Sequence, residues 1–366
     1  MGSQEAPQGG RRQYLDWLRG VAVVVMIMGH GVDSWTQESD RNGAGYRRSL
    51  FVSGIGGAPV FLFLAGVALA LAAGARTRAG RTAAEVAALA RARGWQVFGL
   101  AFLFRLQAWV ISGGDPQRML KVDILNVMGL SMLGAAILWS LGGNRSPRVL
   151  LLSVAAFCAA MITPIVRAAE SLALLPDPIE AYLRPVAGAS FSLFPWAGFV
   201  FAGCAVGVWL DLSHTRGHER NTTTTAWLAV AGVVIALAGY AASFLPPIYA
   251  QTSFWSSSPT FFFVRLGLVL CLLSAASAFR GRAHGRSRLA EFGRSSLFVY
   301  WIHVELAYGV VSMPLHRSLS LERALIGVIL LSLLMYALVQ AKMRFVEYRQ
   351  ASPPWRSPTR RGYPVG

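Results

Sequence analysis

The residues of this sequence that could do chemistry are a few ionisable side chains set in long apolar runs. Arg19 and His30 share one run and lie eleven residues apart. At 100° per residue this spacing is three helical turns plus about 20°, so both side chains fall on one helix face, about 16 Å apart along the axis. Asp16 comes one turn before Arg19, and Asp33 one turn after His30. An imidazole beside a carboxylate is suited to general acid–base chemistry near neutral pH.

Other apolar runs hold further polar side chains, and an ionisable group at membrane depth costs about 2.5 to 3.5 kcal/mol, so each is a functional hypothesis. His303 has Tyr300 three residues earlier on the same helix face. His303 is interpreted either as a residue of a functional site or as a core histidine that makes a structural hydrogen bond. Asp123 and Asn126 share a face at the start of another run. The remaining candidates within spans are Arg105, Gln107, Arg265 and Glu305.

The elements that must position these side chains are membrane-spanning helices. Of the 366 residues, 54% are hydrophobic and only 14% are charged, against roughly 25% charged in soluble proteins. Runs of about 20 apolar residues, the length that crosses the hydrocarbon core as a helix, recur along the chain. We therefore expect an all-α polytopic transmembrane helix bundle of about ten spans, at residues 15 to 36, 51 to 73, 94 to 112, 122 to 141, 149 to 166, 192 to 211, 225 to 245, 260 to 279, 295 to 313 and 324 to 341.

The charge distribution predicts the orientation. The net charge of +17 would suggest nucleic-acid binding in a soluble protein, but here it follows the connections between spans, so no nucleic-acid partner is expected. Alternate connections together with the termini carry 22 Lys and Arg, the other connections carry 9, and 3 lie within spans. The positive-inside rule then places both termini in the cytoplasm. The stretch 168 to 190, which charges and prolines interrupt, is expected to be a surface or re-entrant segment.

The domain organisation follows from these spans. We expect a cytoplasmic N-terminal tail at 1 to 12, a single transmembrane domain at 13 to 345 and a basic cytoplasmic C-terminal tail at 346 to 366. The N-terminal tail has no apolar segment, so no cleaved signal peptide is predicted. The three cysteines lie in apolar runs, which argues against a disulfide framework. No histidine pair or cysteine cluster has the spacing of metal ligands, so no metal is expected.

Five segments in order carry a resemblance to a known family. They are Leu15 to Gly20 (LDWLRG) leading to His30, Ala58 to Gly66 (APVFLFLAG), Val122 to Leu130 (VDILNVMGL), Phe194 to Trp196 (FPW) and Phe298 to His303 (FVYWIH). The opening resembles that of transmembrane acyltransferases related to acyltransferase 3. The set as a whole, from about residue 12 to 345, resembles the heparan-α-glucosaminide N-acetyltransferase catalytic-domain family, especially its bacterial members.

The resemblance implies acyl transfer from cytoplasmic acetyl-CoA, or another acyl-CoA, to an acceptor across the membrane, with His30 matching the family's catalytic histidine. His30 would act either as a base or as an acyl carrier, with Asp33 stabilising its protonated form. Asn126, His303 or Tyr300 would donate a hydrogen bond to the developing oxyanion. Arginines at the cytoplasmic side are available for the phosphates of CoA, although topology and lipid contact explain them as well; those assigned to CoA are Arg19, Arg76, Arg78 and Arg280.

The acceptor expected from the family is a sugar, amino sugar or other envelope glycan, acetylated at nitrogen or oxygen, and the location expected is a bacterial inner membrane. Membrane lipids are further expected partners, and the sequence leaves undecided whether the protein forms a homodimer. A secondary transporter or flippase is the competing hypothesis, in which the buried charges form a relay; matching inverted halves, which transporters commonly show, are not visible around Pro59 and Pro195. A non-catalytic scaffold would leave the imidazole on a charged helix face unexplained.

Overall fold

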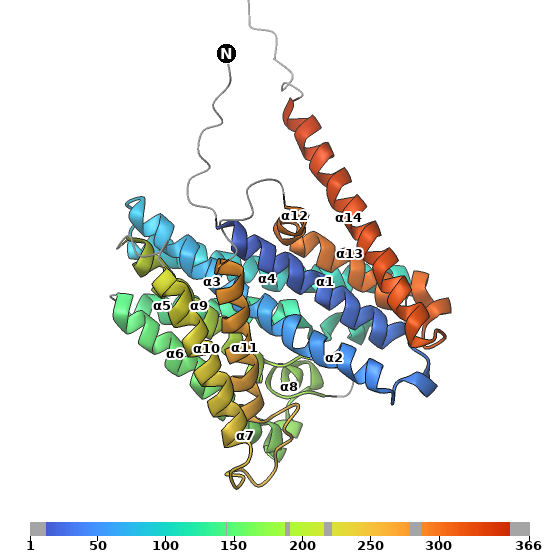
Figure 1. Cartoon of the computed structure of the whole chain (residues 1–366), viewed down its shortest axis with the longest axis horizontal. Helices are drawn as coiled ribbons and strands as arrows, with labels where there is room; N and C mark the ends of the chain where they lie inside the picture. Colours follow the sequence, from blue (N-terminus) through green and yellow to red (C-terminus); the bar gives the residue numbers. More distant parts are fainter. Residues whose placement is uncertain are drawn as a thin grey trace, which may run out of the picture.

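The computed structural model describes residues 12–113, 115–143, 145–186, 191–215, 222–278 and 287–351. Within these ranges the chain is helical and has no strand; the one β-type contact is an isolated bridge between Thr36 and Leu319. Figure 1 shows the helices packed as one bundle, with α1 beside α13 and α14 and with α10 beside α11. The predicted all-α bundle is confirmed.

The structure contains fourteen α-helices in the described residues. Their bounds are α1 Gln13–Trp35, α2 Ala44–Gly56, α3 Ala58–Arg78, α4 Ala83–Ser112, α5 Ile124–Leu141, α6 Arg145–Met161, α7 Thr163–Ala168, α8 Asp177–Leu183, α9 Leu193–Thr215, α10 Thr222–Ala242, α11 Pro259–Ala278, α12 Arg288–Arg294, α13 Ser296–Tyr308 and α14 Leu321–Ala351. Short 3-10 helices lie at Glu38–Asp40, Pro116–Leu120, Glu170–Leu174 and Val310–Leu315.

Nine stretches of the described residues are long and apolar enough to cross a membrane. They coincide with nine of the ten expected spans. The exception is the span expected at 295 to 313, where α13 has only 13 residues and is about 20 Å long, too short for the hydrocarbon core. The helix breaks at Ser295, and α12 precedes it. Together α12 and α13 follow α1 from Asp16, which contacts Gly293, to Ser34, which bonds to Ala307.

The bundle therefore has two sides, which we define by α1. The N-terminal side is the side on which α1 begins, and there Arg12 donates to the carbonyl of Leu210 at the end of α9. On the opposite side, where α1 ends, the backbone N–H of Gln37 donates to the carbonyl of Leu319 at 2.7 Å. The segment 168 to 186, which falls in the stretch expected not to span, forms only short helices, and α8 lies in the lower middle of the view in Figure 1.

Local capping explains where several helices begin. Thr82 and Glu85 form a capping box at the start of α4, and each side chain bonds to the backbone N–H of the other residue. On the opposite side of the bundle, Asp40 accepts the N–H of Leu321 at 2.9 Å and so caps α14. This backbone hydrogen bond, which favours the ionised carboxylate, lowers the pKa of Asp40.

The contact between α1 and α12 is a contact of backbones. A Cβ atom on Gly20 would overlap the carbonyl of Leu289, and a Cβ atom on Gly293 would overlap the carbonyl of Asp16. Any larger residue at either position would push the helices apart, because small residues are what allow two membrane helices to approach this closely. The two glycines thus fix the position of α12, and with it α13, against α1.

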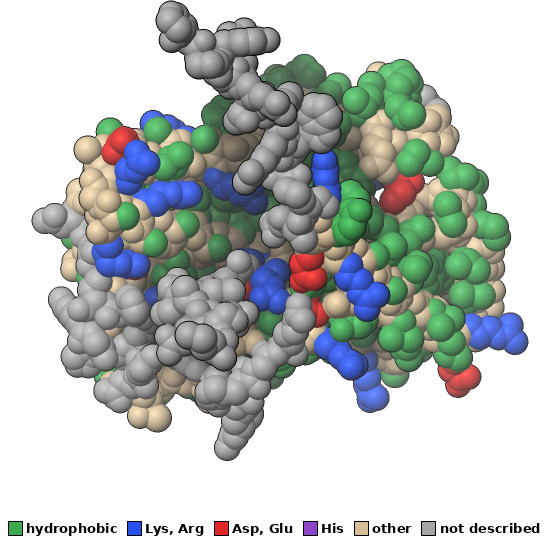
Figure 2. Space-filling model, turned by 90° about the horizontal axis from the view of Figure 1, so that it is seen from above, with side chains coloured by type: hydrophobic (Ala, Val, Ile, Leu, Met, Phe, Trp, Pro, Cys, Tyr) green, Lys and Arg blue, Asp and Glu red, His purple; other side chains and the backbone are tan. Residues whose placement is uncertain are grey.

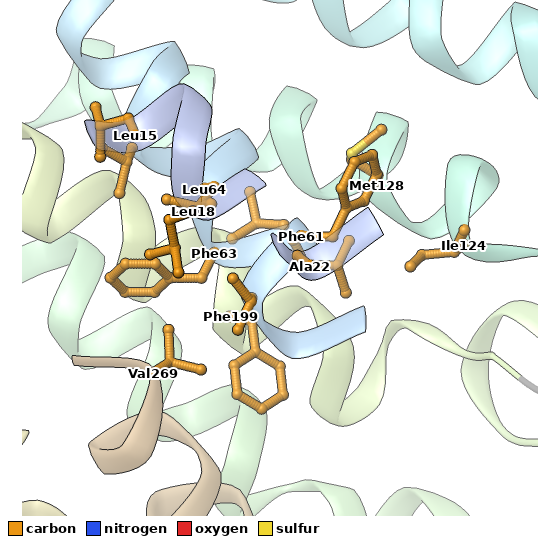
Figure 3. Packing of buried hydrophobic residues seen from close by; sticks show 14 of the residues in the cluster. Leu15, Leu18, Ala22, Phe61, Phe63, Leu64, Ile124, Met128, Phe199 and Val269 are labelled. Atoms are coloured by element: carbon orange, nitrogen blue, oxygen red, sulfur yellow. The ribbon is translucent and has the colours of Figure 1, made fainter. Parts of the chain in front are cut away.

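The core lies where α1, α3, α5, α9 and α11 meet. Leu18 and Ala22 of α1, Phe63 of α3 and Phe199 of α9 are almost completely buried in one hydrophobic cluster, as Figure 3 shows. Apolar side chains also face outward, and the candidate spans of α10 and α14 are only 17% and 28% buried inside the bundle. An apolar surface of this extent is what a lipid bilayer covers.

Candidate active site

Two histidines from distant parts of the chain meet inside the bundle. His30 lies five residues before the end of α1, and His303 lies in α13. Their rings are stacked, with centroids 5.2 Å apart and planes inclined by 13°. The Nδ1 atom of His30 and the Nε2 atom of His303 are 3.1 Å apart, within hydrogen-bond range. His303 is completely buried, whereas His30 keeps partial exposure. We call these two residues the imidazole pair.

The hydrogen bonds of His303 define the tautomers of the imidazole pair. Its Nδ1 atom lies 2.7 Å from the carbonyl oxygen of Val299. A carbonyl only accepts hydrogen bonds, so the Nδ1 atom of His303 carries the proton, and in the neutral ring its Nε2 atom is then an acceptor. That acceptor takes a hydrogen bond from the Nδ1–H of His30. In the neutral pair the Nε2 atom of His30 is therefore left with a free lone pair, as a base requires.

The free nitrogen of His30 is also accessible. The described side-chain atoms that are both buried and without a hydrogen bond come from seven other residues and do not include His30. Since the Nε2 atom of His30 has no hydrogen-bonding partner among the described residues and is not one of these atoms, it is not completely enclosed by them. The same holds for the hydroxyl of Tyr300, although Tyr300 as a whole is only 4% exposed. The ring of Tyr300 is 5.8 Å from that of His303.

Asp33 is held by other partners than the imidazole ring. One of its carboxylate oxygens accepts from Arg41 at 3.0 Å and from Tyr46 at 3.3 Å, and the other accepts from Tyr308 at 3.1 Å. The ring of Tyr308 in turn meets His30 edge-on, with centroids 5.4 Å apart. The structure thus places Tyr308 in contact with both Asp33 and His30, and the ring of His30 is oriented by His303 and Tyr308.

A second group of buried polar side chains lies at the start of α5. Asp123 caps this helix by accepting from the N–H groups of Leu125 and Asn126, and Asn126 accepts the N–H of Asp123 at 3.0 Å. The Nε atom of Arg105, from α4, lies 3.3 Å from the free carboxylate oxygen of Asp123. This is an ion pair whose angles fall outside those of a hydrogen bond. The carboxylate of Asp123 thus offsets part of the cost of placing the Arg105 guanidinium within a membrane-spanning helix.

Asn126 completes this group by donating to the hydroxyl of Tyr182 in α8 at 3.2 Å. Burial raises the pKa of the Tyr182 phenol, so the hydroxyl stays protonated. Arg105, Asp123, Asn126 and Tyr182 thus form one connected network, here called the capping cluster. The amide of Asn126 is already used at both ends, and only one of its N–H groups is without an assigned partner.

Aromatic side chains separate the capping cluster from the imidazole pair. Phe104 in α4 lies 5.9 Å from Tyr300 and 5.3 Å from Trp301, measured between ring centroids. The indole N–H of Trp301 donates to the amide oxygen of Gln107. These contacts join α4 to α13 and place Tyr300 between the two polar groups.

The arginines expected to bind CoA lie toward the N-terminal side wherever they are described. Arg19 is 3.6 Å from Asp16, and Arg78 forms an ion pair with Asp211 of α9. The side chain of Arg76 makes no hydrogen bond or ion pair with the residues described, although its backbone carbonyl accepts the N–H of Arg81. Arg280 lies outside the described residues. Figure 2 shows Lys and Arg side chains gathered on the face seen from above, toward which the end of α14 points in Figure 1. In the described ranges no group of three or more His, Cys, Asp or Glu could hold a metal ion.

Two contributors to the site are absent from the sequence-based candidates. Tyr308 is five residues from His303, a spacing that puts the two on different faces of a regular helix, so helical periodicity gave no reason to select it. Tyr182 lies in the stretch interpreted as a surface segment. The observed contacts of both residues depend on tertiary packing between distant helices, which local spacing does not encode.

The fold and the site together define a polytopic membrane protein with an accessible, hydrogen-bonded imidazole inside its helix bundle. Comparison with protein families identifies the group further. The model of the family described as "Heparan-alpha-glucosaminide N-acetyltransferase, catalytic" matches residues 11–240, and the chain belongs to this family. It is thus an integral membrane protein of an acetyltransferase family. A search of curated proteins finds no match to the chain.

Proposed function

We propose that this protein transfers an acetyl group from acetyl-CoA, bound from the cytoplasm, to an amino sugar or sugar on the far side of a bacterial inner membrane. The observation that carries the proposal is the accessible Nε2 atom of His30, which the hydrogen bonds from Val299 through His303 leave as an acceptor. Family membership supports the reaction class. The opposing locations of the arginines and of His30 support transfer across the bundle, with both termini cytoplasmic.

The proposed reaction is direct. The acceptor amine, or hydroxyl, attacks the thioester carbon of acetyl-CoA, and a C–N or C–O bond forms as the carbonyl oxygen gains negative charge. The Nε2 atom of His30 takes the proton of the acceptor. Collapse of the tetrahedral intermediate breaks the C–S bond, and the same proton passes from His30 to the leaving sulfur. The products are the acetylated acceptor and CoA thiol, and His30 is returned to its starting state.

The other members of the site have assigned parts in this proposal. His303 is a positioning residue, because its N–H is used by Val299 and its other nitrogen holds the proton of His30 in place. The accessible hydroxyl of Tyr300 is suited to donate to the oxyanion. Asn126 has one N–H left for the same purpose. Asp33 is proposed to act through Tyr308, whose ring contacts His30 and whose hydroxyl donates to Asp33, and so to favour the positive charge that His30 acquires.

Arg76, Arg19, Arg78 and Arg280 are proposed for the phosphates of CoA. Arg76 is the strongest candidate among the described members of this set, because Arg19 and Arg78 already contact Asp16 and Asp211. A guanidinium group binds phosphate oxygens in pairs, which suits this role. Their proposed location at the cytoplasmic surface is consistent with a donor that cannot cross the membrane by itself.

Purified protein in lipid vesicles, supplied with radiolabelled acetyl-CoA and glucosamine as the acceptor probe, tests the proposal. The His30→Ala variant should lose about 10²- to 10⁴-fold in the rate of acetylglucosamine formation, because it removes the general base. His316→Ala is the matched control, since His316 is an exposed histidine of a connecting loop. Unchanged transfer in His30→Ala would overturn the assignment of His30.

The same preparation separates direct transfer from an acyl-histidine. Wild-type protein and His30→Ala are each incubated with labelled acetyl-CoA alone and then denatured rapidly. If transfer is direct, the wild-type chain should carry no more label than the variant. A labelled wild-type chain whose label is lost in His30→Ala would establish the acyl-carrier route. Uptake of glucosamine into vesicles without acetyl-CoA would instead favour a transporter.

A further inference from the structure

Arg265 is a charged side chain inside the bundle that has no assigned role in the proposed reaction. It lies six residues after the start of α11, which begins on the side of the bundle opposite the N-terminal side. His30 lies five residues before α1 ends on that same side. With a rise of 1.5 Å per residue, the two residues lie about 7.5 and 9 Å along the helix axis from helix ends on the same side of the bundle.

Aromatic rings cover the faces of the Arg265 guanidinium. Its central carbon is 3.9 Å from the ring centroid of Phe261 and 5.8 Å from that of Trp196 in α9. Such contacts with the ring faces stabilise a cation, but they leave the N–H groups at the edge of the guanidinium without acceptors. The aromatic rings therefore hold the group in place without satisfying its hydrogen bonds.

The edge of this guanidinium has no partner among the described residues. Its Nε atom is buried without a hydrogen bond. The two terminal nitrogens also have no hydrogen bond or ion pair, and they are not among the buried atoms, so they are accessible. Arg105, at comparable depth, has Asp123 at 3.3 Å. A cation within a membrane-spanning helix is costly without a carboxylate, and the described residues supply no negative charge to balance this one.

A short path links Arg265 to the imidazole pair. A Cβ atom on Gly54 of α2 would lie 3.9 Å from a terminal nitrogen of Arg265. The neighbouring residue, Ser53, packs its hydroxyl against Gly29 in α1, and Gly29 directly precedes His30. Helix α2 therefore lies between the Arg265 guanidinium and the segment of α1 that holds His30, and it touches both through adjacent residues.

We propose that Arg265 binds an anionic group of the acceptor, so that the acceptor is a negatively charged sugar or amino sugar. The proposal rests on the proposed function and names the class of its acceptor. The position of Arg265 in the half of the bundle away from the N-terminal side assigns the anion to the acceptor and leaves the CoA phosphates to the arginines of the N-terminal side. A guanidinium with free edge nitrogens can bind a carboxylate or phosphate through two parallel hydrogen bonds.

The first test measures anion binding without catalysis. Wild-type protein in phosphatidylcholine nanodiscs is heated with increasing inorganic phosphate at constant ionic strength, and phosphate should raise the unfolding temperature because it binds only the folded state. Arg265→Met should show no such rise, and without phosphate it should unfold at a higher temperature than the wild type, since an unbalanced buried charge is removed. Arg167→Met is the matched control, because the Nε atom of Arg167 is also buried without a hydrogen bond.

The second test measures selectivity between two acceptor probes, glucosamine 6-phosphate and glucosamine. The wild type should prefer the phosphate in kcat/KM by about 10- to 100-fold, and Arg265→Met should lose this preference while keeping its rate with glucosamine. His30→Ala should keep the phosphate-induced stabilisation although it loses transfer, so the subsite and the proposed function fail separately.

Three results would overturn the proposal. The first is an equal rise of unfolding temperature with phosphate in the wild type and in Arg265→Met. The second is no rise in either protein. The third is an Arg265-dependent stabilisation by phosphatidylglycerol in the nanodisc that phosphate does not displace, which would assign the anion to a lipid headgroup.

Discussion

The imidazole pair and the capping cluster are both buried polar groups, yet they differ in what remains unused. In the capping cluster, each carboxylate oxygen of Asp123 faces a backbone N–H or Arg105, and Asn126 reaches both Asp123 and Tyr182. In the imidazole pair, one nitrogen of His30 has no partner and is accessible. The difference indicates that the capping cluster fixes the start of α5, whereas the imidazole pair is available for chemistry.

The comparison also shows what buried polarity means in this bundle. A depth argument treats all ionisable groups within spans alike, because each costs free energy to insert. The hydrogen bonds divide them into groups that satisfy one another and groups that have an unused donor or acceptor. An unused donor or acceptor therefore indicates function better than burial does. By this criterion the main candidates are the Nε2 atom of His30, the hydroxyl of Tyr300, the edge of Arg265 and the unassigned N–H of Asn126.

The largest effect is expected from a variant that changes the tautomer of His30. His303→Leu removes the acceptor for the Nδ1–H of His30, and we expect kcat to fall by about 10²- to 10⁴-fold, as when a catalytic imidazole is left in the wrong tautomer. His303→Gln offers an amide oxygen in place of that nitrogen and should recover part of the rate. Acetyl transfer and its pH profile measure both. Equal rates in the two variants would show that His303 has no role in holding the tautomer.

The capping cluster should respond in stability. Asp123→Ala leaves Arg105 buried without its carboxylate and removes the cap of α5, and we expect a loss of about 3 to 5 kcal/mol in the free energy of unfolding. Activity per folded molecule should stay near that of the wild type. Asp177→Ala, which removes an exposed acid, serves as the control. Thermal unfolding and acetyl transfer on the same samples decide the matter. A large loss of specific activity with normal stability would move Asp123 into the chemistry.

Tyr300 lies between the two regions and so tests the boundary. Tyr300→Phe keeps the ring that packs on Phe104 and His303 and removes only the accessible hydroxyl. We expect kcat to fall by about 10²- to 10³-fold, the loss typical of one oxyanion donor, with KM for acetyl-CoA little changed. A fall in stability with an unchanged kcat would place Tyr300 with the structural residues.

The smallest effect is expected at the edge of the imidazole pair. Tyr308→Phe keeps the ring edge against His30 and loses the hydrogen bond to Asp33, which is worth about 1 to 3 kcal/mol when the acceptor is charged. Asp33 keeps Arg41 and Tyr46, so acetyl transfer should fall only severalfold. Tyr308→Ala, which also removes the ring contact, should fall further. Identical rates in the two variants would assign the effect to the hydroxyl alone.

Much of the fold is readable from the sequence because hydrophobicity and helix length are local properties. Nine expected spans match helices of the structure, and the tenth differs because its helix ends at Tyr308, where Gly309 has an extended backbone that an apolar window averages over. The candidate residues of the site were found by the cost of placing them in a membrane. Their partners were not, because the contact between His30 and His303 joins residues 273 positions apart. Spacing within one helix cannot show which distant helix lies opposite.

The same limit explains Asp33 and Asn126. Asp33 is one turn from His30 on the same helix, which favoured a direct contact, yet Arg41, Tyr46 and Tyr308 reach the carboxylate. Asn126 is three residues from Asp123, and this spacing is also that of a capping box, which the structure has at this position. Both alternatives are compatible with the sequence, and packing decides between them.

The glycine contact between α1 and α12 has a consequence for temperature. Side chains that pack across a helix interface change rotamers more often as the temperature rises, and the spacing of the helices then fluctuates. At Gly20 and Gly293 the backbones touch with no side chain between them, so there are no rotamers to populate. The spacing of α1, which carries His30, and α12, which leads directly into the helix of His303, should thus vary little with heat. The temperature dependence of the enzyme should accordingly reflect the barrier of acyl transfer until the bundle itself unfolds.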